Sequence, residues 1–259
     1  MKATGDDNES AKVVVTGAAG GIGAATVRRL VGRGARVLAV DLDDVGLDSL
    51  VADLGSSVIP HRADVSDDDE AEEMIATAVL ELGQLDGLFN NAGIVGVRAP
   101  VVEYPTDDFD RVYRTNVRGV FLGMKHGIAA MVASGGGSIV NAASTGAMVG
   151  ASNMAAYISS KHAVLGLTRT AALEVARQGI TVNAIAPGTV DTAMVQPFFA
   201  GLSSEEAEKR LLGVTPTGRI ASPDEIAAVA TWLLLDSPTY LTGALIPIDG
   251  AQTAAAGTA

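Results

Sequence analysis

The sequence predicts an α/β protein with a single doubly wound parallel sheet of about seven strands, flanked by helices. Two observations predict this class. Short apolar runs alternate with helical patterns almost from end to end, which is the order of elements in βαβ units. Hydrophobic residues make up 48% of the 259 residues, while aromatic residues make up only 4%. Such a core must be built mainly from Ala, Val, Leu and Ile, which suits parallel strands covered on both faces.

The first half of the chain alternates regularly between the two patterns. A β-branched run at 12–16 is broken by Gly17, which predicts a central strand. Helical spacing of apolar residues then alternates with further runs of this kind. In order, these predict a helix at 22–32, a strand at 36–41, a helix at 45–54, a strand from 57 to near 64, a helix at 67–82 with acids at its N-terminus, and a strand at 87–90.

The second half continues the pattern with longer helices. Thr106 is the expected N-cap of a long helix within 106–133, because Asp107 and Asp108 follow in the first turn. Ser222 followed by Pro223 predicts a further helix start. In order, the remaining elements are a strand at 138–142, a proline-free helix after Tyr157, a strand at 180–186 that ends at Pro187, the helix from 223, and an edge strand at 245–249, where Pro247 cannot donate a hydrogen bond to a neighbour.

No break in composition and no repeat divides the chain, so we expect one domain over 11–259 after a disordered acidic tail at 1–10. The segment Ala193–Gly213 joins an apolar stretch to a charged amphipathic one. An insertion after the sixth strand falls at the carboxyl ends of the strands, where ligands bind in such sheets. We therefore expect this segment to be a substrate lid; the alternative is a plain pair of surface helices.

The composition excludes several classes of function. A formal net charge of -12 argues against nucleic acid, because phosphate binding needs clustered Lys and Arg. The chain has no cysteine, so disulfide and thiolate chemistry are excluded. Its three histidines show no ligand spacing, and no metal site is expected. A polar N-terminus and the lack of an apolar run of about 18 residues predict no signal peptide, no membrane span and a cytoplasmic protein.

A glycine-rich turn follows the first predicted strand. Glycines let the backbone approach a pyrophosphate closely, and the next helix offers free N–H groups and a positive dipole end. The spacing Gly-x-x-x-Gly-x-Gly departs from the Gly-x-Gly-x-x-Gly fingerprint, and a plain connector is the alternative. The strand–turn–helix context favours dinucleotide binding by Gly17, Gly20, Gly21, Ile22 and Gly23.

Asp41 ends the second predicted strand, 18 residues after Gly23. A carboxylate there can accept hydrogen bonds from ribose hydroxyls and repels a 2′-phosphate. Neither the glycine turn nor the residues from Leu42 to Asp44 supply a basic side chain. The sequence therefore predicts NAD rather than NADP, with Asp41 and Leu42 at the adenosine ribose. A turn-forming aspartate is the alternative.

Tyr157 and Lys161 are four residues apart and share one face of their predicted helix. An ammonium beside a phenol is expected to stabilise the phenolate and lower the tyrosine pKa. Ser144, at the end of the preceding strand, can donate a hydrogen bond to a substrate oxygen. Taken alone, a Tyr-x-x-x-Lys pair is more often an ordinary surface pair; the rest of the chain reverses that interpretation.

Together these motifs resemble the short-chain dehydrogenase/reductase family, and the resemblance covers about 13–249. It rests on an ordered set: the glycine turn, Asn90-Asn91-Ala92-Gly93, Asn116, Ser144, Tyr157-x-x-x-Lys161 and Pro187-Gly188. The family resemblance implies a Rossmann fold and a tyrosine acid/base at Tyr157. It further implies that Ser144 polarises the substrate oxygen, that Lys161 holds the nicotinamide ribose, and that Asn116 supports a water relay.

The resemblance also places the remaining cofactor contacts. It implies that Asp64 and Val65 contact the adenine, and that Asn91, Ala92 and Gly93 lie along the adenosine side. It implies that the nicotinamide carboxamide is fixed by Pro187, Gly188, Val190 and Thr192. Since members of the family are commonly tetramers, we expect a homotetramer.

The predicted reaction is NAD-dependent interconversion of a secondary alcohol and a ketone. A cyclic or hydrophobic small molecule is expected, because the candidate walls are apolar: Ile94, Val95, Met148, Met154, Val195, Phe198 and Phe199. Two alternatives stay open. One is a 3-oxoacyl-acyl carrier protein reductase, although its acidic partner would need a basic dock. The other, from a different class, is a non-catalytic NAD-binding regulator or scaffold.

Overall fold

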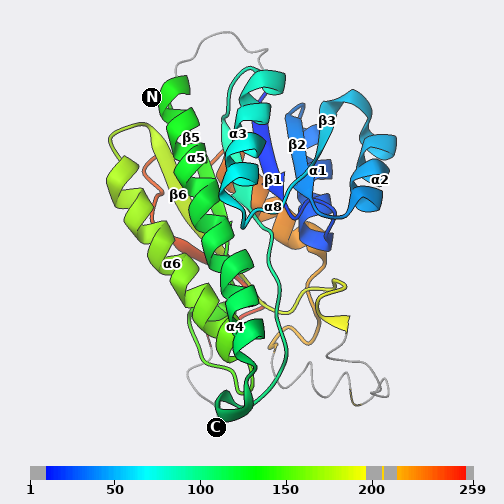
Figure 1. Ribbon diagram of the computed structural model, residues 1–259, viewed down its shortest axis with the longest axis vertical. Coiled ribbons are helices and arrows are strands. Elements are labelled where there is room, and N and C mark those ends of the chain that lie inside the picture. The colour runs from blue at the N-terminus through cyan, green and yellow to red at the C-terminus, as the bar shows by residue number, and fades with distance from the viewer. Residues whose placement is uncertain (1–9, 197–205, 207–214, 255–259) are drawn as a thin grey trace.

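A seven-stranded sheet lies at the centre of the computed structural model, which describes residues 10–196, 206 and 215–254 (Figure 1). The strand order is β3-β2-β1-β4-β5-β6-β7, and every neighbouring pair is parallel. This confirms the predicted fold class. The strands are β1 (Lys12–Thr16), β2 (Arg36–Asp41), β3 (Val58–Arg62), β4 (Gly87–Asn90), β5 (Gly137–Ala142), β6 (Ile180–Pro187) and β7 (Leu245–Ile248).

Burial explains why the strand sequences do not alternate between apolar and polar residues. Every residue of β1, β4 and β6 is buried, because helices cover both faces of the parallel sheet. The last strand, β7, is less buried and lies at the sheet edge, where Pro247 is exposed. Its position at an edge is the one that the proline predicts.

The helices form a layer on each face of the sheet. One hydrophobic core joins α3, α5 and α6 to the sheet, and a second core joins α1, α2 and α8 to the opposite face. Figure 1 shows α5 and α6 side by side across the first of these faces. The helices are α1 (Gly21–Gly32), α2 (Asp44–Leu54), α3 (Asp68–Leu82), α4 (Thr106–Tyr113), α5 (Gly119–Ser134), α6 (Ala155–Val175) and α8 (Pro223–Leu235).

The long helix predicted within 106–133 is interrupted. A π-helical turn at Arg114–Arg118 separates α4 from α5. The expected N-cap was also wrong by one residue: Pro105, with extended backbone, is the N-cap, and Thr106 is already helical. The start of α8 is as expected, since Ser222 and Glu225 form a reciprocal capping box.

Two predictions fall wholly or mainly outside the described residues. The acidic tail at 1–10 is described only at Ser10, and the lid at 193–213 only at 193–196 and 206. Among the residues that are described, no helix is long and apolar enough to span a membrane. In the same ranges, no group of three His, Cys, Asp or Glu side chains could hold a metal ion.

Candidate active site

The glycine turn (Thr16–Gly23) connects β1 to α1 through a backbone that requires glycine at Gly17 and Gly23. Gly17 has a φ of +63°, and a Cβ added there would lie 2.9 Å from the Cα of Ala92. A Cβ on Gly23 would overlap the carbonyl oxygen of Gly17. Gly23 thus lets α1 pack closely under the turn. The N-cap of α1, Gly20, has no side chain to cap the helix, so first-turn N–H groups are left for an anion.

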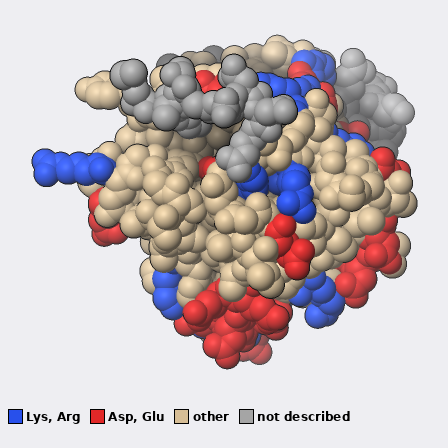
Figure 2. All heavy atoms as spheres, turned by 90° about the horizontal axis from the view of Figure 1, so that it is seen from above, with Lys and Arg blue, Asp and Glu red and all other residues tan. Residues whose placement is uncertain are grey.

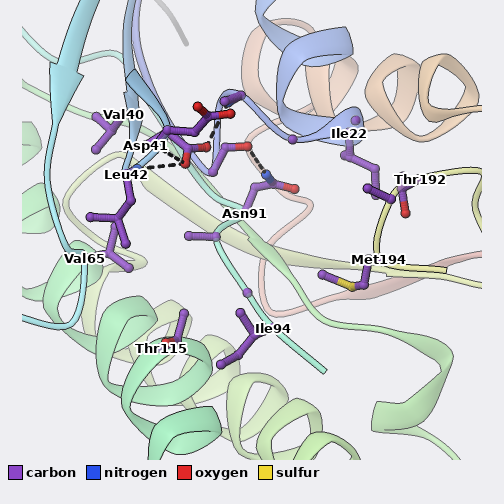
Figure 3. Close-up of a pocket in the computed structure, with 18 of the residues that line it drawn as sticks. Ile22, Val40, Asp41, Leu42, Val65, Asn91, Ile94, Thr115, Thr192 and Met194 are labelled. Atoms are coloured by element: carbon purple, nitrogen blue, oxygen red, sulfur yellow. Dashed lines mark hydrogen bonds between the residues drawn. The ribbon is translucent and has the colours of Figure 1, made fainter. Parts of the chain in front are cut away.

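A cleft of about 670 Å³ lies along the carboxyl ends of the strands. Figure 3 shows Asp41, Leu42 and Val65 along one side of it, with Ile94 and Thr115 at one end and Thr192 and Met194 opposite. Twelve residues of the expected cofactor set line it: Gly17, Gly20, Gly21, Ile22, Asp41, Leu42, Asp64, Val65, Asn91, Ala92, Gly93 and Thr192. Its volume and elongated lining suit a dinucleotide.

Both carboxylate oxygens of Asp41 accept backbone hydrogen bonds. The N–H of Ala19 donates to Oδ2 at 2.9 Å, and the N–H of Leu42 donates to Oδ1 at 2.7 Å. Asp41 therefore ties the end of β2 to the glycine turn and holds a fixed negative charge in the cleft. Arg62, its register partner on β3, forms an ion pair with Asp44 at 3.5 Å. This basic neighbour was not predicted, because Arg62 lies on β3, outside the glycine turn and residues 42–44.

Asn91 ties β4 to β1 beneath the cleft. Its side-chain amide donates to the carbonyl oxygens of Thr16 at 2.9 Å and Gly17 at 3.1 Å. The hydroxyl of Thr16 accepts the N–H groups of Asn91 and Ala92 in return. At the far end of the cleft, Asp64 is itself held by Ser66, whose hydroxyl donates to it at 2.7 Å.

Four polar residues, here called the tyrosine cluster, meet beside the cleft: Asn116, Ser144, Tyr157 and Lys161. The ammonium of Lys161 lies 5.6 Å from the centre of the Tyr157 ring, as the four-residue spacing on α6 predicts. The side chain of Ser144 lies close enough to Tyr157 to lower the pKa of its phenol. Ser144 follows β5 and caps a short 3₁₀ turn at Thr145–Ala147. A Cβ on Gly93, which lines the cleft, would lie 3.5 Å from the Lys161 nitrogen.

The pKa of Tyr157 corrects one expectation. Burial raises it above the ordinary value, and the hydrogen bond with Ser144 only partly opposes that rise. Burial also lowers the pKa of Lys161 to about 8, because the enclosed ammonium is removed from water. The Lys161 nitrogen donates a hydrogen bond to the Ala142 carbonyl oxygen at 2.7 Å. Lysine therefore does not depress the tyrosine pKa in the protein alone.

Asn116 lies in the π-helical turn and is fully buried. Its amide donates to the carbonyl oxygen of Ile94 at 2.9 Å, and its oxygen accepts the N–H of Ile94 at 2.8 Å. The same amide donates to the hydroxyl of Ser160 at 3.0 Å, which donates to the carbonyl oxygen of Tyr157. π-turns are frequent at functional sites, and this one aims Asn116 at both Ile94 and α6.

The residues expected at the nicotinamide end follow β6. Pro187 ends this strand, and the N–H of Gly188 donates to the carbonyl oxygen of Ile248 at 3.0 Å. Val190 is buried and forms a bridge with Ala221, and Thr192 returns to the cleft. Of this set, only Thr192 lines the cleft.

The expected substrate walls are placed unevenly. Ile94 lines the cleft, Val95 and Val195 are partly buried, and Met154 forms a bridge with Ala99. Met148 is 41% exposed. Phe198 and Phe199 lie outside the described residues.

Eight residues line the cleft that the predicted site set does not include: Ala19, Val40, Asp43, Ala63, Arg111, Thr115, Ala193 and Met194. Arg111 and Thr115 are four apart on consecutive turns and share one face. Met194 belongs to the start of the expected lid.

The amino-acid sequence is similar to a family model and to proteins of known activity. A family model described as enoyl-(acyl carrier protein) reductase matches residues 17–253. Levodione reductase from Leifsonia aquatica is 39% identical over 251 residues, which cover 94% of each sequence. Cis-4-hydroxycyclohexanecarboxylate dehydrogenase from Sinomonas cyclohexanicum is 40% identical over 245 residues, covering 93% of this chain and 96% of that protein.

Solved structures agree with the sequence comparison. A crystal structure of levodione reductase matches with a TM-score of 0.91 at 38% identity, covering 95% of this chain and 98% of the other. A structure of 3-ketoacyl-(acyl-carrier-protein) reductase from Brucella melitensis complexed with NADH matches with a TM-score of 0.88 at 29% identity, covering 95% and 99%.

A doubly wound parallel sheet with a glycine turn, an elongated cleft and an adjoining tyrosine cluster defines a nucleotide-binding oxidoreductase of the Rossmann type. With the family match and the identities above, the chain belongs to the short-chain dehydrogenase/reductase family. It is an oxidoreductase that acts on CH–OH groups with NAD or NADP.

Proposed function

We propose that this protein interconverts a cyclic or hydrophobic secondary alcohol and its ketone, with NAD as cofactor. The observation that carries the proposal is the meeting of Ser144, Tyr157 and Lys161 beside Gly93 at one end of the cleft. A scaffold that only binds nucleotide has no use for a buried lysine beside a tyrosine and a serine, since burial of the lysine ammonium costs free energy.

The residues present fit a dinucleotide. The uncapped N-terminus of α1 and the glycine turn offer N–H groups for a pyrophosphate. Asp41 keeps a carboxylate at the second strand end, which favours ribose hydroxyls and disfavours a 2′-phosphate. Arg62, the basic neighbour, is already paired with Asp44. These features favour NAD over NADP.

The chemistry of the chain is proton transfer and orientation. Bound nicotinamide supplies the hydride acceptor or donor. The Tyr157 hydroxyl gives a proton to the substrate oxygen in reduction and, as phenolate, takes it in oxidation. Ser144 donates a hydrogen bond to the same oxygen, and the Lys161 ammonium stabilises developing negative charge at the phenol oxygen. Asn116 fixes the backbone at Ile94 and, through Ser160, the first turn of α6.

The substrate class follows from the walls and from the relatives. Of the expected walls, Ile94 lines the cleft and is apolar, as are Val95 and Met154 outside its lining, so an uncharged ring or chain is favoured over a polyanion. The names of two relatives refer to cyclic compounds, levodione and cis-4-hydroxycyclohexanecarboxylate. We therefore place cyclic secondary alcohols first.

A 3-oxoacyl-acyl carrier protein reductase is the second candidate, because one matching structure has that activity in its description. Its acidic carrier needs a basic docking surface. Figure 2 shows Lys and Arg side chains scattered over the face it presents, with acidic side chains gathered at one edge. The net charge of -12 also disfavours this partner.

We also propose a homotetramer. Large apolar side chains are exposed on the two helices that lie side by side across one face: Phe121 and Val132 on α5, and Leu173 on α6. Exposed apolar groups of this kind favour an interface. Light scattering on the purified protein would test it, and a monomeric mass would refute it.

The test of function is reduction of NAD and of NADP, followed by absorbance, across cyclic and linear secondary alcohols. We expect turnover with NAD and a cyclic alcohol. Tyr157→Phe should lower kcat by about a hundredfold to ten-thousandfold, with NAD affinity measured by calorimetry little changed. Turnover confined to NADP and acyl thioesters would favour the carrier-protein reductase. NAD binding without turnover of any substrate would favour a regulator.

A further inference from the structure

The segment that leaves β4 and runs to α4, residues 94–104, is here called the wall segment. It begins at Ile94, which lines the cleft and lies near Thr115 at one end of it (Figure 3). Both polar backbone groups of Ile94 are held by Asn116. Further along, the N–H of Ala99 donates to the carbonyl oxygen of Asn153 at 3.2 Å. The wall segment is thus fixed at both sides of its middle.

Asp108, in the first turn of α4, holds the middle of the wall segment. Its Oδ2 accepts the N–H of Val97 at 2.7 Å and the hydroxyl of Tyr104 at 2.9 Å. The bond to Val97 is the largest cause of the lowered pKa of Asp108. The charged carboxylate is therefore the form that binds the wall.

The chain passes Asp108 too closely for any residue but glycine. Gly96 has a φ of +77°, and a Cβ there would lie 2.6 Å from the Asp108 carboxylate and 2.7 Å from the Tyr104 hydroxyl. A left-handed glycine packed against a carboxylate fixes the path of the chain. The close approach of Gly96 to the Asp108 carboxylate therefore joins α4 to the wall segment, which an ordinary cap within one helix would not do.

The other oxygen of Asp108 binds the guanidinium of Arg111. Arg111 lines the cleft, and no other Lys, Arg or His does so among the residues described there. Pairing with Asp108 offsets the positive charge of Arg111 beside the cleft. One carboxylate thus contacts both the wall segment and the cation beside it.

We propose that Asp108 is a positioning residue that sets substrate selectivity: it fixes the wall segment beside the substrate and neutralises Arg111, so that the pocket favours uncharged substrates. This inference rests on the proposed function, because it concerns the substrate end of the same cleft. Asp108 acts through Val97 and Arg111 and is not itself in contact with the reacting atoms.

Hydrogen exchange tests the wall independently of any substrate. In Asp108→Ala, we expect amides in 94–104 to lose protection while those of the central strands keep it. Asp107→Asn is the matched control, because Asp107 lies in the same helix turn and is exposed. Unchanged exchange at 94–104 in Asp108→Ala would overturn the proposal, whether or not the enzyme's substrate is known.

Kinetics test the consequence for selectivity. Asp108→Ala should raise KM for a cyclic alcohol about tenfold, with kcat within about threefold and unchanged NAD affinity. Asp108→Asn keeps an oxygen for Val97 and should restore KM. It should also favour a carboxylate-bearing cyclic alcohol over its uncharged analogue by about tenfold, because Arg111 is no longer neutralised.

A role in stability alone predicts another result: a lower Tm and equal losses of kcat for all substrates, with unchanged KM. That outcome would refute the assignment. Absence of activity in the wild-type protein with every secondary alcohol would refute the proposed function instead, and hydrogen exchange would still decide the role of Asp108 at the wall.

Discussion

The two ends of the cleft are built in different ways. At the glycine turn, the backbone forms the site. Gly17 and Gly23 have no Cβ atom that would overlap the neighbouring backbone, and backbone N–H groups hold the Asp41 carboxylate. At the tyrosine cluster, buried and half-buried polar side chains from three elements form the site, and burial lowers the pKa of Lys161 to about 8. The first end is organised by shape and tolerates little added volume. The second is organised by charge and hydrogen bonding, and should respond to pH.

The largest expected effect breaks the shape-based end. Gly23→Ala places a methyl group against the Gly17 carbonyl, and should lower the free energy of unfolding by about 3 kcal/mol and abolish NAD binding. Gly32→Ala, at the other end of the same helix, meets nothing within 4 Å and should be neutral or slightly stabilising. Chemical denaturation and calorimetry measure both. Equal effects of the two substitutions would contradict the packing argument.

The charge-based end gives the next effect. Between pH 8 and about 9.5, folded Lys161 has lost a proton that the unfolded chain, with a lysine pKa of 10.5, still holds. The free energy of unfolding of the wild type should therefore rise relative to that of Lys161→Met by up to about 1.4 kcal/mol per pH unit. Denaturation of both proteins without cofactor, across this pH range, measures it. A constant difference would show that Lys161 titrates normally.

A third substitution asks whether the shape-based end also uses charge. Asp41→Asn keeps an oxygen for the Ala19 or Leu42 N–H but removes the carboxylate, and should shift the ratio of kcat/KM for NADP to that for NAD by about tenfold toward NADP. Asp48→Asn, an exposed change of equal charge on α2, is the control. If both variants shift the ratio alike, net charge and not Asp41 sets the preference.

The smallest effect lies outside both ends. Ser222→Ala removes the side-chain oxygen that accepts the Glu225 N–H at the start of α8, and should cost about 1 kcal/mol, or about 3 °C in Tm. KM values for both substrates should stay unchanged. A thermal scan measures Tm and steady-state kinetics measure KM. An altered KM would mean that the start of α8 affects the geometry of the cleft.

Much of the fold was predictable because parallel strands buried on both faces leave a plain signal. The β-branched run at 12–16 and the capping pattern at Ser222 each depend on neighbouring residues alone, and both were placed correctly. The alternation predicts about seven parallel strands, whereas the order in which they lie in the sheet is seen only in the structure.

The parts that escaped prediction depend on contacts distant in sequence. The hydrogen bond from Asn116 to Ser160 joins residues 44 apart in the sequence. Arg62 lies opposite Asp41 only because β2 and β3 pair in the sheet. The sign of the Tyr157 pKa shift depends on burial, which the spacing of Tyr157 and Lys161 does not reveal. The π-turn at 114–118 gives no local signal, since its residues are compatible with an ordinary helix.

That π-turn has a consequence for how the chain tolerates length changes. Deleting one residue within 114–118 would let α4 and α5 join as a regular helix, which local hydrogen bonding favours. The residues on either side would then rotate by about 100° relative to one another, and the side chain of Asn116 would leave Ile94. The extra residue of the π-turn thus sets the rotation of α4 relative to α5 about their common axis. This rotation allows α4 to face the cleft while α5 faces α6.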